Sequence, residues 1–288
     1  MGAFAAWRFH NAAEREIRPK AGGLRQMGIS TAKAIARLSR LPSCAVAFLT
    51  VIVPTYAHTS DAMASMAAAV PILTICMCTF ILNDLNDMER DRVNHPERPL
   101  PSGAISPRDA AAAYAVIFTA SLLSITFFID QYLHYLYFML LLLGVGYNVT
   151  VNHLARLKTI HVAITISLGL ILVSRLIQLD LDMKVLATAF LFILGRELLM
   201  DVQDAGGDGD TFAKRLQPRN ATLVAFALQG LGVLTLFFAV TAAWEAVAAS
   251  IIALLLFAII WEWRKKERRR HLLLLMQVQM LWGIVFLV

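Results

Sequence analysis

Two short stretches rich in acidic residues interrupt a sequence that is otherwise strongly apolar. The first, NDLNDMERDRVNHPERPLPSG, covers residues 83–103, and the second, GRELLMDVQDAGGDGDTFAKR, covers residues 195–215. In each stretch, side chains with oxygen atoms recur every three or four residues, which would place them on one face of a helix. The first set is Asn83, Asp84, Asp87 and Asp91, and the second is Glu197, Asp201, Asp204 and Asp208.

This oxygen-only set of side chains predicts a site for a hard divalent cation. Mg2+ prefers oxygen ligands and tends to share its coordination sphere with phosphate oxygens. Carboxylates crowded beside a membrane repel one another and need a counter-charge. The predicted ligand is therefore a phosphate or diphosphate held through Mg2+. The basic side chains expected to hold the remaining phosphate oxygens are Arg90, Arg92, Arg98 and Lys158.

The competing interpretation is that each acidic stretch is a solvated helix end whose aspartates pair with neighbouring arginines. That interpretation explains one stretch as well as the metal site does. It explains two such stretches on the same side of a membrane less well.

Long apolar segments must position these residues. The chain has 288 residues, a mean hydropathy of +0.65 and only 16% charged residues, whereas soluble domains carry roughly 25%. Apolar runs of this length fit a bilayer, where backbone hydrogen bonding requires helices. The nine segments cover residues 43–58, 64–82, 108–129, 133–151, 160–178, 184–200, 220–241, 244–261 and 272–288. The sequence predicts an all-α polytopic membrane protein, with about nine transmembrane helices around a cavity that opens to the cytoplasmic side.

The distribution of basic residues predicts the orientation. Of the 26 Lys and Arg residues, 24 fall in the N-terminal tail or in connections on the same side, and only Arg175 and Lys184 lie on the other. The positive-inside rule then places the N-terminus and both acidic stretches on the cytoplasmic side. Residues 1–40 are expected to be a cytoplasmic tail and residues 41–288 a single transmembrane domain. Residues 24–40 have the pattern of a helix on the inner leaflet, with a solvated tail as the alternative.

The acidic stretches also resemble a known family. NDLNDMERD, RPLPSG and RELLMDVQDAGGDGD are similar to the two motifs of the UbiA superfamily of intramembrane prenyltransferases. The second motif is most similar to the DxxDxxGD form of the glyceryl-phosphate, homogentisate and chlorophyll branches. RLSRLPSCAVAF resembles the first-helix signature of the family, with Ser43 in place of its Asn. YNVTVNHLARLK resembles the loop after the fourth helix, which places Tyr147 and Lys158 in matching roles.

The resemblance implies roles for individual residues. Asn83, Arg98, Tyr147 and Lys158 are expected to contact the diphosphate of a prenyl donor. A prenyl tail would lie between helices in contact with lipid, and Tyr147 or Phe80 would stabilise an allylic cation. The expected catalytic residues are Asp84, Asp87, Asp91, Asp201, Asp204 and Asp208. The expected Mg2+ ligands are Asn83, Asp87, Asp91, Asp201, Asp204 and Asp208.

The predicted function is Mg2+-dependent transfer of a prenyl group from a prenyl diphosphate to an aromatic or polar-lipid acceptor within the membrane. A terpene cyclase using the same diphosphate-ionising site is one alternative. A cation-dependent transporter or lipid-binding protein is another. Nucleic acid is not an expected partner, because no soluble domain is left to bind it.

Overall fold

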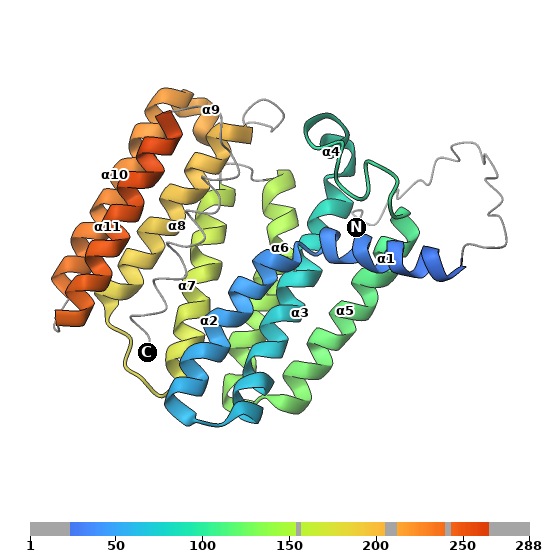
Figure 1. The fold of residues 1–288 in the computed structure, drawn as a ribbon, viewed down its shortest axis with the longest axis horizontal. Coiled ribbons are helices and arrows are strands. Elements are labelled where there is room, and N and C mark those ends of the chain that lie inside the picture. Colours follow the sequence, from blue (N-terminus) through green and yellow to red (C-terminus); the bar gives the residue numbers. More distant parts are fainter. Residues whose placement is uncertain (1–23, 154–156, 205–211, 240–242, 265–288) are drawn as a thin grey trace, which may run out of the picture.

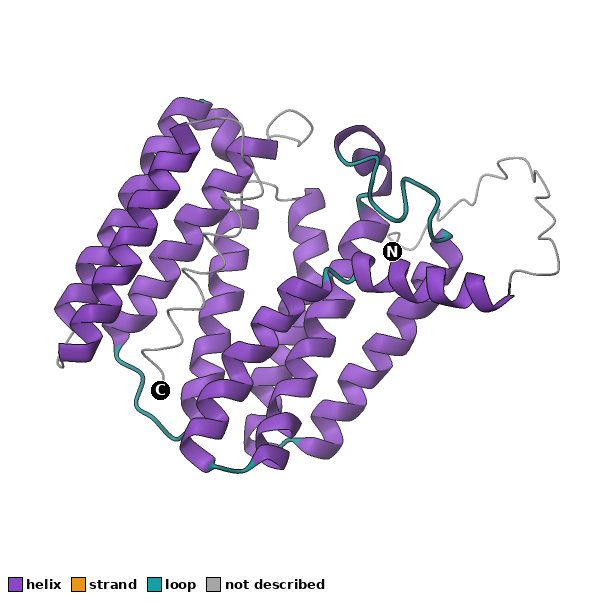
Figure 2. Cartoon of the chain, in the orientation of Figure 1, coloured by secondary structure: helices purple, strands orange, loops and turns teal. Residues whose placement is uncertain are grey.

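The computed structural model describes residues 24–153, 157–204, 212–239 and 243–264, and within these ranges it contains helices and no β-strand (Figure 2). The long helices pack side by side as a bundle (Figure 1). They are α2 (Leu41–Thr59), α3 (Ala62–Asn86), α5 (Pro107–Phe128), α6 (His134–His153), α7 (Lys158–Leu176), α8 (Met183–Asp204), α10 (Pro218–Ala239) and α11 (Ala243–Arg264). The short elements are α1 (Leu24–Leu38), α4 (Met88–Asn94), the 3-10 turn η1 (Gln131–Leu133) and α9 (Phe212–Leu216).

The prediction of an all-α fold is confirmed for these residues. Each of the first eight apolar segments coincides with one long helix, and five of these helices, α2, α3, α5, α7 and α10, are long and apolar enough to cross a membrane. The ninth segment, residues 272–288, lies outside the described residues. The number of membrane spans and the direction in which a cavity opens therefore stay predictions.

Local side-chain bonds fix where two of the helices begin. The carboxylate of Asp61 accepts a hydrogen bond from the backbone N–H of Ala64 at 3.0 Å, which caps α3. The hydroxyl of Ser106 accepts one from Asp109 at 3.1 Å, and Pro107 is the first residue of α5. Both are normal N-terminal signals, because they satisfy N–H groups that have no partner within the helix.

The apolar interior forms two main cores. The larger takes its buried residues from α2, α3, α5, α6 and α7, and includes Tyr137, whose hydroxyl donates to the carbonyl of Ala68 at 2.8 Å. The second is formed by α8, α9, α10 and α11. There, a Cβ on Gly195 would lie 2.7 Å from the backbone oxygen of Ala225, so a glycine is needed for α8 and α10 to approach so closely. No buried cluster among the described residues includes members of both α7 and α8.

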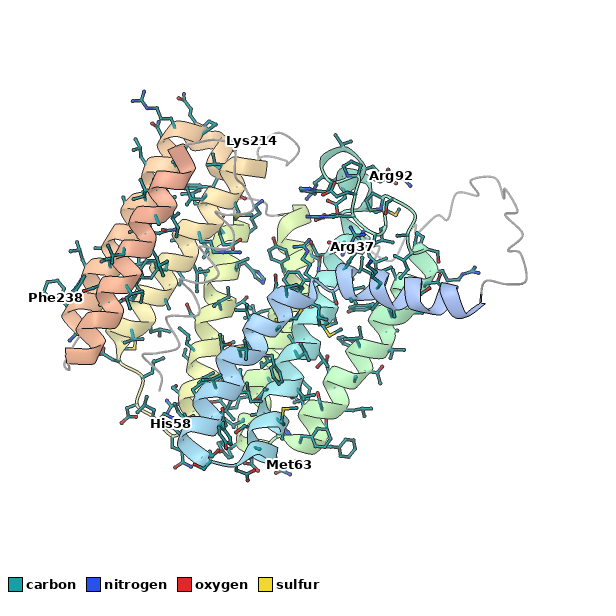
Figure 3. The ribbon with its side chains drawn as sticks, viewed as in Figure 1. Arg37, His58, Met63, Arg92, Lys214 and Phe238 are labelled. Atoms are coloured by element: carbon teal, nitrogen blue, oxygen red, sulfur yellow. The ribbon has the colours of Figure 1, made fainter. Side chains whose placement is uncertain are left out.

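Helix α1 lies across one end of the bundle, near α3 and α5 (Figure 1). Its buried Ala34 and Leu38 join a small apolar cluster with Ile81, whereas Lys33 and Arg37 are exposed. The exposed Arg37, Arg92 and Lys214 lie toward this end of the molecule, and His58 and Met63 lie at the opposite end (Figure 3). Within the predicted residues 24–40, a helix is present over Leu24–Leu38, and its position on a membrane surface stays a prediction.

Candidate active site

The first acidic stretch is held at the junction of α3 and α4. Asn83 and Asp84 lie in the last turn of α3, and Asp91 lies in α4. The sequence suggested one continuous helix, but Asp87 interrupts it with φ −92° and ψ 6°. The N–H of Asp87 still donates to Asn83 at 2.9 Å, and that of Asp91 donates to Asp87 at 2.8 Å. The interruption is therefore small, and the four predicted side chains stay together.

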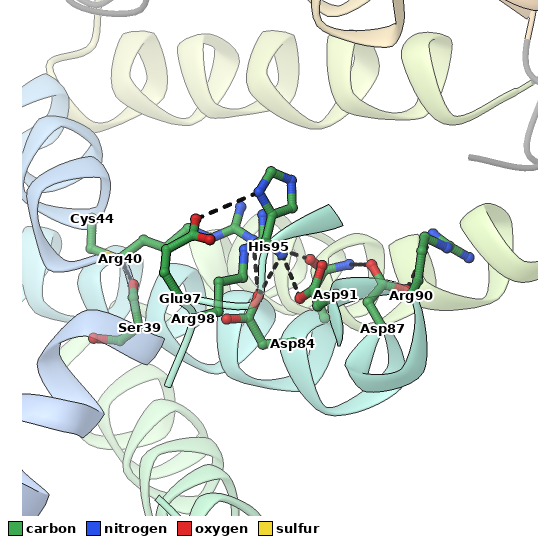
Figure 4. Close-up of polar contacts among 11 residues, drawn as sticks. Ser39, Arg40, Cys44, Asp84, Asp87, Arg90, Asp91, His95, Glu97 and Arg98 are labelled. Atoms are coloured by element: carbon green, nitrogen blue, oxygen red, sulfur yellow. Dashed lines mark hydrogen bonds and ion pairs between the residues drawn. The ribbon is translucent and has the colours of Figure 1, made fainter. Parts of the chain in front are cut away.

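Two buried carboxylates in this stretch are compensated by arginines. Asp84 and Asp91 are only 2% and 3% exposed. The Nη1 atom of Arg98 lies 2.6 Å from Asp91 Oδ2 and 3.6 Å from Asp84 Oδ1 (Figure 4). Arg40 Nη2 lies 2.9 Å from the same Asp84 oxygen. Since an unpaired buried charge is strongly destabilising, these arginines compensate for the burial of the two carboxylates.

Asp87 is bound to its neighbours on the same stretch. Asn83 Nδ2 donates to Asp87 Oδ2 at 3.0 Å, and Arg90 Nη1 lies 3.3 Å from Asp87 Oδ1. Arg92 does not join this network, because it pairs with exposed Glu89 at 2.8 Å. Of the three arginines predicted to hold phosphate here, Arg90 and Arg98 lie at the acidic cluster and Arg92 points to solvent.

The second acidic stretch contributes one well-defined carboxylate. Asp201 on α8 is 1% exposed and forms an ion pair with Lys158 at the start of α7. Thr159 Oγ1 also donates to Asp201 Oδ2, at 3.4 Å. Glu197 pairs with the adjacent Arg196. The side chain of Asp204 and the whole of Asp208 lie outside the described residues, so their predicted roles stay predictions.

Tyr147 on α6 lies near residues of both stretches. Its phenol is within electrostatic range of Glu197 and Lys158, and also of Asp87 and Arg40. Its ring packs edge-on against His161 with ring centroids 5.8 Å apart. The two acidic stretches, more than a hundred residues apart in the sequence, are thus brought to one place around this residue.

Two residues at the site were not predicted. One is Arg40, which adopts the left-handed conformation (φ 48°) just before α2 and so directs its guanidinium toward Asp84. The guanidinium carbon lies 4.9 Å from the centre of the Phe80 ring, a cation–π distance. Arg40 therefore covers one face of Phe80, a ring that was expected to stabilise an allylic cation. The sequence did contain a signal for Arg40, because the RLPS stretch that begins there resembles a family signature.

The second unpredicted residue is Asn148, next to Tyr147. It is 5% exposed, and its Oδ1 atom is buried without a hydrogen-bond partner. Gly144 lies one helical turn before Asn148 and packs against Thr79 of α3. On α3, Asn83 lies one turn after Thr79. Because α3 and α6 run toward the same end of the bundle (Figure 1), Asn148 lies at the level of Asn83. Because buried polar atoms without a partner are rare in native proteins, this oxygen makes Asn148 a candidate residue of the site.

The fit of a metal ion can be tested against these contacts. All the donors that the first stretch offers are carboxylate or amide oxygens, which suits Mg2+. Within the described ranges, however, no three His, Cys, Asp or Glu side chains lie together closely enough to hold a metal ion. The acidic groups described instead have basic partners, and two of the predicted ligands, Asp204 and Asp208, fall outside the part of the site that is described.

Comparison with known proteins identifies the family. The sequence matches the UbiA prenyltransferase family over residues 41–282. The chain belongs to this family. The assignment drawn from the acidic motifs is thereby confirmed, and the class of enzyme after which the family is named agrees with the predicted one.

Curated relatives in the UbiA family are archaeal enzymes. A digeranylgeranylglyceryl phosphate synthase of Methanoculleus marisnigri is 27% identical over 229 residues, which are 76% of each chain. One of Methanoregula boonei is 31% identical over 172 residues, 54% of this chain. That second match spans little more than half, 58%, of the M. boonei protein.

Solved structures show that the UbiA fold extends through most of the chain. A UbiA homolog from Archaeoglobus fulgidus bound to GPP and Mg2+ superposes with a TM-score of 0.71 at 16% identity, covering 88% of this chain and 96% of the other. The apo structure of a UbiA homolog from Aeropyrum pernix K1 gives 0.67 at 18% identity, covering 88% and 98%. At these identities the similarity establishes the shared fold.

Proposed function

We propose that this protein is an integral membrane, Mg2+-dependent prenyltransferase that moves a prenyl group from a prenyl diphosphate to a hydroxyl of a polar lipid of the glyceryl phosphate type. One observation carries the proposal: Tyr147 is within electrostatic range of Asp87 in the first acidic stretch and of Glu197 in the second, and each stretch also holds a buried carboxylate, Asp91 or Asp201, with a basic partner. The DxxDxxGD form of the second motif is compatible with a glyceryl phosphate acceptor, and the names of the relatives favour it over the aromatic acceptor that the sequence also allowed.

The basic residues would hold the donor. Arg98 and Lys158 now pair with Asp91 and Asp201, and both would exchange a carboxylate for diphosphate oxygens when the donor binds. The planar guanidinium of Arg98 can contact two phosphate oxygens at once. Asn83 and Tyr147 would add polar contacts to the same group. Asp84, fixed between Arg40 and Arg98, would orient both guanidinium groups toward the donor.

The acidic residues would hold the metal. The oxygen atoms assigned to this role belong to Asn83, Asp87, Asp91, Asp201, Asp204 and Asp208. Bound Mg2+ would supply positive charge that stabilises the departing diphosphate. Arg90, 3.3 Å from Asp87, would be freed from that carboxylate and left facing the same anion.

The proposed transfer forms an ether. The carbon–oxygen bond between the prenyl group and the diphosphate breaks, and the acceptor hydroxyl forms a new carbon–oxygen bond with the allylic carbon. Diphosphate and the hydroxyl proton leave. Burial of the site would keep water from capturing the allylic carbon first, because the groups around it are largely desolvated.

The placement in the membrane is part of the proposal. Residues 41–288 would form one transmembrane domain with both acidic stretches at the cytoplasmic surface, and residues 1–40 would form a cytoplasmic tail. Helix α1 would lie on the inner leaflet, with Lys33 and Arg37 toward the anionic headgroups.

Transfer by the purified protein tests this function. Prenyl diphosphates of several lengths are incubated with glyceryl phosphate lipids and with aromatic acids, with Mg2+ or with EDTA, and products are identified by mass spectrometry. We expect a prenyl ether of a glyceryl phosphate lipid, formed only with Mg2+. Metal-dependent diphosphate release without an acceptor would instead indicate a terpene cyclase. The absence of any diphosphate release would favour the transporter or lipid-binding alternative.

A further inference from the structure

An apolar groove of about 460 Å³ lies between α7 and α8. Its walls are almost entirely hydrocarbon, with Ile164 and Ile171 on α7 and Met183 and Phe190 on α8. The volume falls within the range of roughly 300–1,000 Å³ that is usual for small-molecule sites. The residues that would bind the diphosphate and the metal do not line it.

The groove lies in line with the polar site. Thr159, Ala163 and Ser167 recur every four residues, so each lies about 40° further around α7 than the one before it. Thr159 contacts Asp201, whereas Ser167 and Ile171 line the groove. With a rise of 1.5 Å per residue, Ser167 lies about 12 Å and Ile171 about 18 Å beyond Thr159 along the helix. The polar contact at Asp201 and the apolar groove therefore both lie between α7 and α8, at successive positions along α7.

This arrangement fits an amphiphile with an anionic head and a linear hydrocarbon tail. An isoprene unit adds four main-chain carbon–carbon bonds of about 1.5 Å each, so that an extended unit is roughly 5 Å long. A tail of two units would therefore end before Ser167. The third and fourth units would lie beside Ser167 and Ile171.

We propose that the α7–α8 groove holds the third and fourth isoprene units of the prenyl donor, and that the small side chains of Ser167 and Ala187 set the length of tail that is accepted. This inference rests on the proposed prenyltransferase function. Ser167 is buried and its hydroxyl has no hydrogen-bond partner. Hydrogen bonding therefore does not explain why this position is a serine. Its small size leaves the groove open, as does that of Ala187 on the opposite wall.

Filling the groove tests the proposal. Ser167→Leu and Ala187→Phe are made in the full-length protein, one on each wall, and each is assayed with geranyl, farnesyl and geranylgeranyl diphosphates. We expect the ratio of kcat/KM for the geranylgeranyl donor to that for the geranyl donor to fall at least tenfold, with the geranyl value itself little changed. Unreactive thiolodiphosphate analogues of the same lengths report binding independently of turnover, through the rise in melting temperature that each produces. In both variants, the longest analogue should no longer raise the melting temperature more than the shortest one does.

Two control variants separate filling of the groove from other effects. Ser167→Ala removes the hydroxyl without filling the groove, and Ala120→Phe makes the same enlargement at an exposed position of α5. Both should keep the chain-length profile of the parent. An unchanged profile in Ser167→Leu and Ala187→Phe, or an equal loss for all three donors, would overturn the groove assignment. Failure of the parent to transfer any prenyl group would instead refute the proposed function on which it rests.

Discussion

Removing the guanidinium group of Arg98 should destabilise the fold much more than removing that of Arg92. The two ion pairs have similar lengths, 2.6 Å for Arg98–Asp91 and 2.8 Å for Arg92–Glu89. Their exposure differs: the side chains are 26% and 4% exposed in the first pair, and 57% and 75% exposed in the second. Burial, not distance, therefore distinguishes the two pairs.

The expected size follows from the local dielectric. At 2.6 Å and an effective dielectric constant of about 20, two unit charges attract by roughly 6 kcal/mol, and at 2.8 Å in water by roughly 1.5 kcal/mol. Desolvation removes several kcal/mol from the first value, and side-chain entropy with salt screening removes most of the second. We expect coupling energies of about 2–4 kcal/mol for Arg98–Asp91 and about 0–1 kcal/mol for Arg92–Glu89.

Double-mutant cycles measure both couplings in one protein. Arg98→Met and Asp91→Asn are made singly and together, and Arg92→Met with Glu89→Gln provides the exposed control. Unfolding is followed by circular dichroism in mixed micelles of a mild detergent and SDS. The Arg98→Met variant alone should lose about 3 kcal/mol, because Asp91 has no other ion-pair partner in the described part of the chain. Equal couplings for the two pairs would refute the conclusion that burial makes the first pair structurally important.

Three further predictions concern the metal, the second acidic stretch and the topology. Asp87→Asn and Asp204→Asn should each lower turnover at least a hundredfold with little change in melting temperature, and near-normal activity in either would contradict the metal assignment. Lys158→Met should lower the free energy of unfolding by about 3 kcal/mol, because it removes the basic partner of the buried Asp201 carboxylate. Adding Asp201→Asn should restore stability but not turnover. Restored turnover in the double variant would exclude Lys158 and Asp201 from catalysis. A cysteine at Asp61 should react with an impermeant maleimide added outside intact cells, and labelling only after lysis would reverse the predicted orientation.

The sequence predicted the elements of the site better than the contacts within it. Apolar runs of membrane length dictate helices, so each of the first eight predicted segments coincides with a long helix. Pro96 and Pro99 predicted the end of the helix that carries Asp91, and α4 does end at Asn94. Spacing every three or four residues correctly brought Asn83, Asp84, Asp87 and Asp91 together, because these relations are local along the chain.

The missed features depend on packing between distant segments. Arg40 reaches Asp84, 44 residues away in the sequence, through a left-handed backbone conformation that no residue type in RLPS requires. The buried, unpartnered oxygen of Asn148 exists only because α6 packs against its neighbours. Phe80 could be recognised as an aromatic residue near the site, but the arginine over its ring could not.

The separation of the apolar interior into two cores has a thermodynamic consequence. The first acidic stretch begins on α3, whose buried residues pack with α2, α5, α6 and α7, whereas Asp201 belongs to α8, whose buried residues pack with α9, α10 and α11. A donor that contacts both stretches would act as a cross-link between two parts that are otherwise joined without a shared core. Mass action then adds about 2.7 kcal/mol to the unfolding free energy when the free donor is at a hundred times its Kd. Loss of diphosphate after each turnover would remove that cross-link, so that heat inactivation should be slowest while substrate is abundant and faster once it is consumed.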